Sequence, residues 1–412
     1  MLLLIPLKTT AQIDLKTSLS KWVDTSHPHY NSSQLTSEIK RLHALRADVT
    51  RSICTDSSYS YTYNNHALKD LMEYHACLLE CTNRGFPTCG RDAKVNGTLD
   101  ANLQFSWRNA FDQHEENTLS DATKSHFNYE IACVLWNIAS MMMYRAASVH
   151  TWNSKEDLAL VKSDYMNSAL IFEHIKSILK KANTKPNAIT NDLTTPSLDM
   201  CQYLCLAQGQ VTLYEALKMK LNTDQSVATY TLISQIAAGA ADLYDKALIS
   251  SQESIIKVNP SSKAYGAHFK SLSMLFKARA EYLQSMVDRK KGNYGNEIFR
   301  LIRCENMIDE GYDFTKSNGK QSIHMMAGPA SLGKNALEVF KTLKRTTKQR
   351  LSSVKKENQK IYHEKIPDDC DKIAGKNMMS KNIRDNEGEL VALPKEFLPE
   401  SLSRPMFASI PK

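Results

Sequence analysis

The chain has 412 residues, a formal net charge of +8 and 42% apolar residues. This composition is typical of a globular protein and excludes the collagen-like and the intrinsically disordered classes. The length alone would allow about two or three domains.

The first part of the chain is predicted to be helical, with a small sheet. Apolar residues recur at helical spacing, which predicts helices over residues 12–23, 32–51 and 67–81. His75 falls on the apolar face of the last of these, where it is expected to be a core residue rather than a ligand. Residues 103–107 alternate between apolar and polar side chains, which is the period of a strand. We expect them to form a small sheet with the extended residues 3–8.

The most apolar stretch of the chain covers residues 126–145, where both faces of the expected helix are apolar. Such a helix must be buried on several sides. Its uninterrupted apolar part is too short to cross a bilayer, because Glu130 and Arg145 flank it closely. We therefore predict a central buried helix within residues 123–149, packed against an amphipathic helix at 154–181.

The C-terminal half is predicted to consist of helices joined by short turns. A polar linker at 185–196 precedes helical patterns over residues 198–221, 226–254, 264–291, 296–314 and 332–362. Helix pairs of this kind favour tetratricopeptide-like hairpins, although no fixed repeat period is present. After Pro367 the chain is polar and rich in proline, and residues 367–412 are expected to be extended.

Motifs for catalysis are incomplete. The sequence GPASLGK at residues 328–334 has the glycine and lysine spacing of a phosphate-binding loop, but Asn335 replaces the hydroxyl residue that would reach magnesium. A turn before the last helix is the favoured interpretation, and a nucleotide-using enzyme remains the alternative. His114 lacks the second histidine of a metalloprotease motif. We assign no catalytic residue, metal or cofactor, and expect no enzyme activity.

The cysteines indicate a reducing compartment. Nine are present, an odd number, and the pairs Cys77/Cys81 and Cys201/Cys205 lie one helical turn apart in apolar runs. Core packing is expected for these pairs, and metal binding or a disulfide is the alternative. A cytoplasmic location follows as the expectation.

A basic face is predicted on the last long helix. Seven basic residues follow one another there without an intervening acid, and on a helix they form a broad surface suited to an anionic membrane or an acidic partner. They are Lys341, Lys344, Arg345, Lys348, Arg350, Lys355 and Lys356. A solvated helix face without a ligand is the alternative. Nucleic acid is not expected as a partner, because no aromatic residues interleave the charges.

Several separated stretches, in order and over most of the chain, resemble the BRO (Bro-one) domain of Alix-type adaptor proteins. The stretches are LIPLK at 4–8, FSWRNAF at 105–111, YEIACVLWN at 129–137, LAQGQ at 206–210 and KENQKIYHEKIP at 356–367. The last is the most specific. The resemblance implies that residues 1–412 form one BRO domain, mostly α-helical and boomerang-shaped. It would have a curved helical core at about 123–362 with tetratricopeptide-like hairpins, and a small β-sheet near its N-terminal part.

The resemblance also implies a partner. Members of this family bind the C-terminal amphipathic helix of an ESCRT-III subunit of the charged multivesicular body protein type. Matching the family's pattern places apolar groove residues at Leu213, Leu232 and Ile236 and a charged contact at Lys155. Helix-in-groove binding requires such exposed apolar side chains one turn apart; periodicity alone would make them core residues.

The implied function is that of a non-enzymatic adaptor in the cytoplasm, recruited to endosomal membranes for sorting or scission. A scaffold of the rhophilin type, which has a related domain beside small-GTPase signalling modules, is the alternative.

Overall fold

A computed structural model describes residues 2–26, 29, 33–53, 64–86, 103–111, 123–124, 127–149, 154–181, 189–253, 260–318, 326–327, 336–380, 383–403, 406–407 and 410. Their contacts divide the chain into two compact units that alternate along the sequence. The hairpin unit comprises Met1–Leu4, Arg145–Ala169 and Asp199–Glu389, and the N-terminal unit comprises Ile5–Tyr144, Leu170–Leu198 and Leu390–Lys412.

The helices predicted in the first part of the chain are confirmed. They are α1 (Leu15–Ser26), α2 (Ser33–Ile53), α3 (Asn65–Asn83), α4 (Phe127–Ser148) and α5 (Lys155–Lys181). Helix α3 starts after Asn64 because the Asn64 side chain accepts hydrogen bonds from the first free backbone amides of the helix. Nearly all of α4 is buried, as its apolar circumference predicts. No helix in the described part of the chain is long and apolar enough to span a membrane.

The N-terminal unit encloses two ion pairs that the sequence did not predict. Lys8 donates to Asp192 at 2.5 Å, and Arg46 Nε lies 2.6 Å from a carboxylate oxygen of Glu130, with all four side chains fully buried. Asp192 belongs to the linker predicted to be polar and falls in a short 3-10 turn, Asn191–Leu193. Charges buried this deeply occur in proteins when they are paired. The two pairs are therefore part of the core of this unit.

The predicted sheet is wrong in its pairing. The strands are two residues long: β1 (Leu2–Leu3) pairs with β4 (Met326–Ala327), and β2 (Phe105–Ser106) pairs with β3 (Thr123–Lys124). The N-terminal segment meets the segment of β2 at Thr10, which forms an isolated bridge with Trp107 and donates its hydroxyl to the Ser106 carbonyl at 2.6 Å. Side chains of α4 occupy the backbone groups needed for a longer ladder. Trp136 donates to the Pro6 carbonyl, and the Asn137 side chain bonds both the amide and the carbonyl of Lys8.

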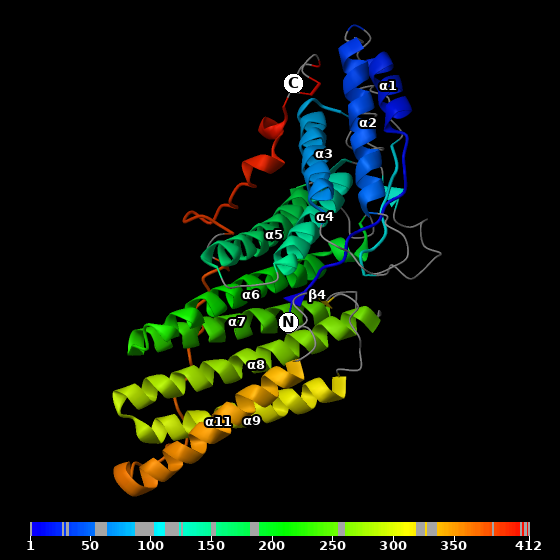
Figure 1. The fold of residues 1–412 in the computed structure, drawn as a ribbon. Coiled ribbons are helices and arrows are strands. Elements are labelled where there is room, and N and C mark those ends of the chain that lie inside the picture. Colours follow the sequence, from blue (N-terminus) through cyan, green and yellow to red (C-terminus); the bar gives the residue numbers. More distant parts are fainter. Residues whose placement is uncertain are drawn as a thin grey trace. The chain divides into compact units, whose positions relative to one another are not determined.

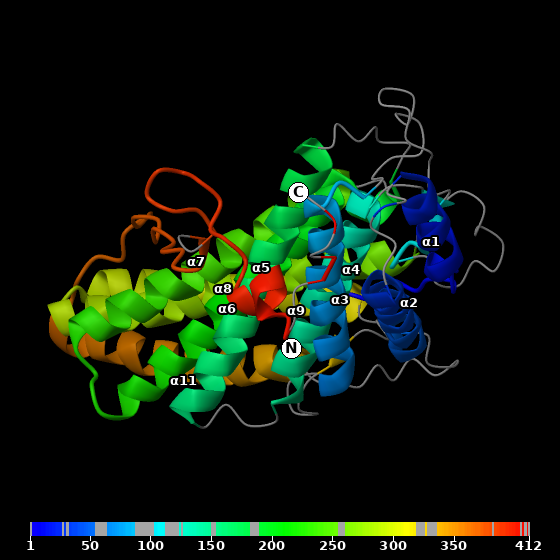
Figure 2. The same ribbon diagram turned by 90° about the horizontal axis from the view of Figure 1, so that it is seen from above.

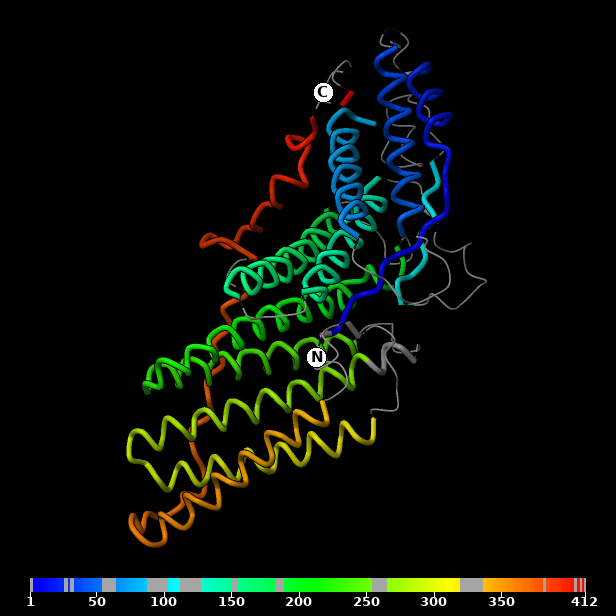
Figure 3. The backbone as a smooth tube through the Cα atoms, viewed as in Figure 1, coloured from blue at the N-terminus to red at the C-terminus, as the bar shows by residue number. Residues whose placement is uncertain are grey.

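The hairpin unit contains the long helices predicted for the C-terminal half. They are α6 (Thr195–Met219), α7 (Val227–Glu253), α8 (Pro260–Lys291), α9 (Tyr294–Asn318) and α11 (Ala336–Glu357), which continues as a π-helical turn over Asn358–Tyr362. Figure 1 and Figure 3 show α6, α7, α8 and α9 following one another as antiparallel neighbours. This is the arrangement of stacked helix hairpins.

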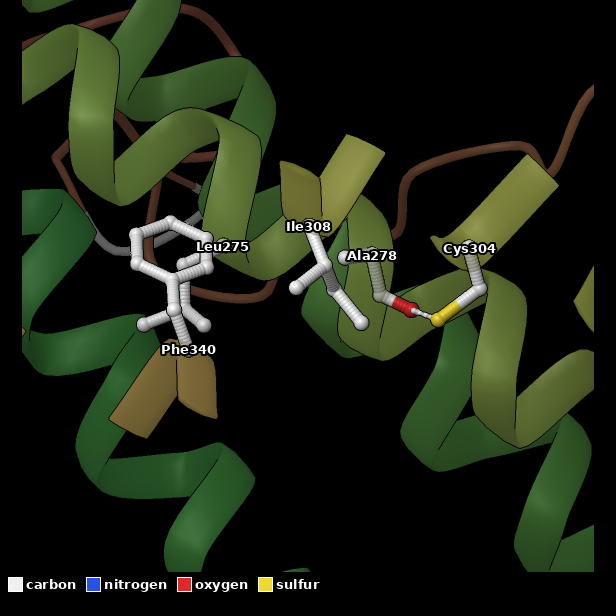
Figure 4. Close-up of a cluster of buried hydrophobic side chains, with 5 residues drawn as sticks. All are labelled: Leu275, Ala278, Cys304, Ile308 and Phe340. Atoms are coloured by element: carbon white, nitrogen blue, oxygen red, sulfur yellow. Dashed lines mark hydrogen bonds between the residues drawn. The ribbon is translucent and has the colours of Figure 1, made fainter. Parts of the chain in front are cut away.

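A cluster of apolar side chains from three helices attaches α11 to its neighbours (Figure 4). The cluster consists of Leu275 and Ala278 from α8, Cys304 and Ile308 from α9, and Phe340 from α11. The Phe340 ring lies so close to Gly311 that a β-carbon there would come within 2.7 Å of it. A small residue at position 311 therefore allows α9 and α11 to pack closely.

The segment after Tyr362 contains only short 3-10 turns among the described residues, at Lys395–Phe397 and Pro399–Ser401. That residues 367–412 are extended stays a prediction. Its last part belongs to the N-terminal unit, where the carbonyl of Phe397 lies 2.9 Å from Nδ1 of His75. His75 is fully buried, as predicted for a core residue, and burial lowers its pKa to about 4.

Candidate functional site

The α6–α7 hairpin positions the residues predicted to contact a partner helix. The two helices join through a short turn, and Nε2 of Gln210 in α6 donates to the carbonyl of Ile236 in α7 at 3.2 Å. Leu213 follows Gln210 by three residues, and Leu232 precedes Ile236 by four. Because the helices are antiparallel, one turn forward along α6 and one turn backward along α7 lead in the same direction. Leu213 and Leu232 therefore lie at about the same level of the hairpin.

The three predicted groove residues differ in exposure. Leu213 and Leu232 are half-buried, so part of each side chain is open to solvent. Ile236 is fully buried, with 0% of its surface exposed. Its assignment to an exposed groove is wrong, since α7 turns that position into the core. Leu232 and Ile236 lie one turn apart on the same side of α7. That side is partly open to solvent at Leu232 and fully covered at Ile236.

A short segment from the C-terminal part covers the hairpin beside these leucines. We call this segment, Gly375 to Met379, the strap. The amide of Lys376 donates to the Gln235 carbonyl at 2.9 Å, and the Lys376 carbonyl accepts from Nε2 of Gln210 at 2.7 Å. The amide of Met378 donates to Oε1 of the same glutamine at 3.2 Å. Gln210 therefore joins α6, α7 and the strap, one turn away from Leu213.

Two glycines make room for the strap. A β-carbon at Gly239 would lie 2.6 Å from the Lys376 carbonyl oxygen, and one at Gly209 would lie 2.2 Å from the end of the Met379 side chain. Met379 is fully buried. The strap thus explains two residues of the LAQGQ stretch. Gly209 leaves room for the Met379 side chain, and Gln210 forms hydrogen bonds with the backbone of the strap. The sequence showed this stretch as a signature but gave no sign of what it contacts.

Lys155 lies in the first turn of α5 and is exposed. The helix starts there because the Ser154 hydroxyl accepts from the amide of Asp157 at 2.9 Å. Further along α5, Asp164 pairs with Arg145 at 2.5 Å, so that carboxylate is already neutralised within the hairpin unit. The role of Lys155 toward a partner stays a prediction.

The hairpin unit has a cavity of about 610 Å³ that the predicted residues do not line. Its walls come from the end of α6, the start of α7, and the facing sides of α8 and α11, with Tyr214, Tyr230 and Arg279 among them. The Arg279 guanidinium lies 5.4 Å from the centre of the Tyr214 ring, and burial raises the pKa of Tyr214 to about 12. Leu232 lies two residues after Tyr230 and so faces nearly the opposite side of α7. The cavity and the two leucines are therefore separate features.

The basic face predicted on α11 is largely paired. Lys341 contacts Glu338 at 2.5 Å, Lys344 contacts Asp309, and Lys348 lies 3.5 Å from Glu305. Arg345 is exposed. The two acidic partners from α9 are distant in sequence, so the run of α11 alone could not reveal them. Contact of these residues with a membrane stays a prediction, and the ion pairs weaken its basis.

The remaining predictions about chemistry have different outcomes. Cys77, Cys81, Cys201 and Cys205 are buried and not disulfide-bonded, which confirms core packing. Groups of three or more residues suited to metal binding are absent from the described ranges. The loop at 328–334 and His114 lie outside these ranges.

Comparisons with known proteins agree with this architecture. A family model described as "BRO1-like domain" matches residues 2–410. The programmed cell death 6-interacting protein of Xenopus laevis is 25% identical over 88% of this chain and 37% of its own length. The vacuolar protein-sorting protein BRO1 of Gibberella zeae is 24% identical over 88% of this chain and 33% of its own length. The chain thus spans about a third of the length of these relatives.

Solved structures show the same fold. One, described as "ALIX BRO1 CHMP4C complex", superposes with a TM-score of 0.70 at 21% identity and covers 92% of this chain and 94% of that chain. Another, described as "Structure basis for endosomal targeting by the Bro1 domain", gives a TM-score of 0.67 at 19% identity and covers 92% of each chain. The prediction of a mostly helical fold of this class is confirmed.

Proposed function

Because the chain belongs to the BRO1-like domain family, we propose that it is a non-enzymatic adaptor that binds the C-terminal amphipathic helix of an ESCRT-III subunit. Recruitment of that subunit to endosomal membranes for sorting or scission is part of the proposal. The "ALIX BRO1 CHMP4C complex", whose structure is similar to this fold, supports this class of partner.

The observation that carries the proposal is the pair of half-buried leucines at one level of the α6–α7 hairpin. An amphipathic helix presents apolar side chains one turn apart, and two neighbouring antiparallel helices with half-buried leucines form a complementary surface. The strap supplies a fixed edge on one side of this surface, since its backbone is bonded to Gln210 and Gln235. Lys155 is proposed to meet an acidic residue of the partner.

The affinity is expected to be modest. Covering an apolar side chain fully is worth about 1.5–3 kcal/mol, and Leu213 and Leu232 are already partly covered. Ordering of the partner helix and its loss of motion reduce the net gain further. A reversible complex suits an adaptor that must release its cargo machinery.

Single charge substitutions test the proposal. Leu213→Asp and Leu232→Asp should each weaken binding of a peptide with the C-terminal helix of an ESCRT-III subunit by at least about tenfold, because each places a carboxylate in an apolar contact. Binding is measured by fluorescence anisotropy of the labelled peptide. The thermal melt should hardly change, as both side chains are partly exposed in the free protein.

Two further variants serve as controls. Ile249→Asp alters a side chain on the same helix α7 that is 54% exposed and lies far from the hairpin level of Leu232, so peptide binding should persist. Ile236→Asp should unfold the hairpin unit, because it buries a carboxylate in the core. The proposal fails if both leucine variants bind the peptide as tightly as Ile249→Asp does.

A further inference from the structure

The end of the hairpin unit where α8 and α11 both terminate carries a dense group of lysines. We call this group the lysine tip; it consists of Lys290, Lys291, Lys355, Lys356, Lys360 and Lys365. All six are exposed. Figure 1 and Figure 2 both place the ends of α8 and α11 at the same end of the unit. The tip includes the most specific sequence stretch, residues 356–367, to which the proposed partner site assigns no role.

Stacked rings and an ion pair hold the two helix ends together. The rings of Tyr294 and Tyr362 stack with their centres 3.4 Å apart, and the Arg289 guanidinium lies 5.0 and 5.6 Å from the two ring centres. Arg289 also pairs with Glu357 at 2.6 Å. The end of α11 is thus fixed against the turn between α8 and α9.

The chain after α11 is fixed as well. The Asn358 side chain donates to the carbonyl of Glu364 at 2.9 Å and accepts from its amide at 3.1 Å. The Glu364 carboxylate accepts from the amide of Gly295 at 2.7 Å. A β-carbon at Gly295 would come within 2.3 Å of the Lys365 carbonyl oxygen, so the two backbones touch. The tip therefore has a defined surface.

The lysines of the tip lack acidic partners within the described residues, in contrast to the paired lysines near the start of α11. Two carboxylates of the same stretch are already engaged, Glu357 by Arg289 and Glu364 by a backbone amide. Lys290 has one further contact, with its ammonium 5.8 Å from the centre of the Tyr230 ring. The tip thus presents several positive charges that are not compensated locally.

An exposed apolar residue lies among these charges. The π-helical turn directs Tyr362 inward onto Tyr294 and leaves Ile361 with 63% of its surface in solvent, and Ile366 is also exposed. Ile361 is the most exposed large apolar residue among the described positions. Ile361 directly follows Lys360 in the chain. An exposed aliphatic side chain next to a positive charge is stabilised by a surface that is anionic outside and apolar beneath.

We propose that the lysine tip is a peripheral membrane contact, in which the six lysines bind the headgroups of anionic phospholipids and Ile361 inserts below them. Lysine ammonium groups on long flexible stems suit a diffuse layer of negative headgroups. The exposed aliphatic side chain of Ile361 suits shallow insertion at the acyl boundary. An acidic protein surface would match the charges but would leave Ile361 without an apolar environment.

Binding to vesicles tests this contact. The full chain is mixed with vesicles of phosphatidylcholine and phosphatidylserine, and with vesicles of phosphatidylcholine alone, and the bound fraction is measured by sedimentation. We expect clear preference for the anionic vesicles and weaker binding as salt is raised, with a remainder due to Ile361, because exposed charges are screened and the apolar contact is not. The variant Lys355→Gln/Lys356→Gln/Lys360→Gln should bind on the order of 100-fold more weakly, since each lysine near an anionic membrane contributes roughly fivefold.

A matched triple variant separates the tip from the rest of α11. Lys341→Gln/Lys344→Gln/Lys348→Gln removes the same charge from the same helix, but from paired lysines, and should bind nearly as the unaltered chain does. Ile361→Ser should lower the binding that survives at high salt. Circular dichroism melts of all variants should coincide, because the altered side chains at the tip are exposed.

Three results would overturn the proposal. The first is equal binding to both kinds of vesicle, which would mean that the charge of the headgroups does not matter, or no binding to either, which would favour an acidic protein as the partner of the tip. The second is an equal loss of binding in the two triple variants. The third is an Ile361→Ser variant that binds as before at every salt concentration. These tests are independent of the proposed helix partner, since no variant alters Leu213 or Leu232.

Discussion

The contact between the strap and α7 can be tested at Gly239. A β-carbon at this position would lie 2.6 Å from the carbonyl oxygen of Lys376, which is too close for any real contact, and 3.0 Å from Nε2 of Gln210. Both neighbouring groups are backbone or buried, so Gly239→Ala must displace the strap. The hydrogen bonds of Lys376 to Gln210 and Gln235 would then be lost.

The expected cost follows from these bonds. Each lost hydrogen bond costs about 1 kcal/mol, and the buried Gln210 amide left without its partner costs about 1–3 kcal/mol more. Alanine has a higher helix propensity than glycine, which stabilises the folded state by about 1 kcal/mol and offsets part of this cost. We therefore expect the free energy of unfolding to fall by about 2–4 kcal/mol, measured by urea denaturation.

A second glycine provides the control. Gly266 lies within α8, and its nearest atoms to a β-carbon are 3.6 Å away, which is ordinary contact. Gly266→Ala should leave stability unchanged or raise it by up to about 1 kcal/mol. Hydrogen exchange at the Lys376 amide should quicken only in Gly239→Ala. Equal stabilities of the two variants, with the Lys376 amide still protected, would refute the reasoning.

Two further outcomes are expected. Phe340→Ala should lower the free energy of unfolding by about 3–5 kcal/mol in urea, because it empties the core between α8, α9 and α11, and a loss below about 1 kcal/mol would contradict that packing. The pKa of His75 is about 4 because burial disfavours the imidazolium, so the unfolded chain binds more protons than the folded chain between that value and 6.5. Stability should therefore fall as the pH drops through this window, by about 2 kcal/mol at about pH 5. His75→Gln should remove this loss of stability at low pH, while the separate loss caused by His268, whose pKa is also about 4, should remain. A pH dependence of stability that is the same in His75→Gln as in the unaltered chain would contradict the prediction.

The helices were predictable from the sequence because each has a local signal. Apolar residues at helical spacing and the turn residues between them determine α6 to α9 almost to their ends, and the apolar circumference of α4 implies its burial. The sheet was not predictable in the same way. The backbone of Pro6 and Lys8 is bonded to side chains of α4, about 130 positions away, and the backbone of Leu3 to the side chain of Gln208. Periodicity within the N-terminal segment carries no sign of these contacts.

The buried charges show the same limit. Lys8 and Asp192 are each polar residues in polar or short segments, and the sequence around each alone predicts an exposed side chain. Only their contact, 184 residues apart, makes burial possible, because either charge without the other would be strongly unfavourable in the core. Arg46 and Glu130 are a second case, with Glu130 taken from sequence as a flanking charge of the central helix.

The candidate site was predictable in part. The α6–α7 hairpin brings Leu213 and Leu232 to one level with exposed surface, as a partner groove requires, but α7 is apolar on more than one side and periodicity could not separate Ile236 from Leu232. The difference depends on what covers each side. That information comes from the neighbouring helices and the strap, which are distant in sequence.

The two proposed surfaces of the hairpin unit differ in the kind of contact they can make. The α6–α7 surface offers leucines beside a strap whose backbone groups are bonded, so a partner there must be apolar and of defined shape. The lysine tip offers charge and one exposed isoleucine on a rigid turn, so a partner there can be fluid and need not be complementary in shape. The residues of the two surfaces do not overlap. The two proposals can therefore be tested separately, by variants that change one surface and leave the residues of the other as they are.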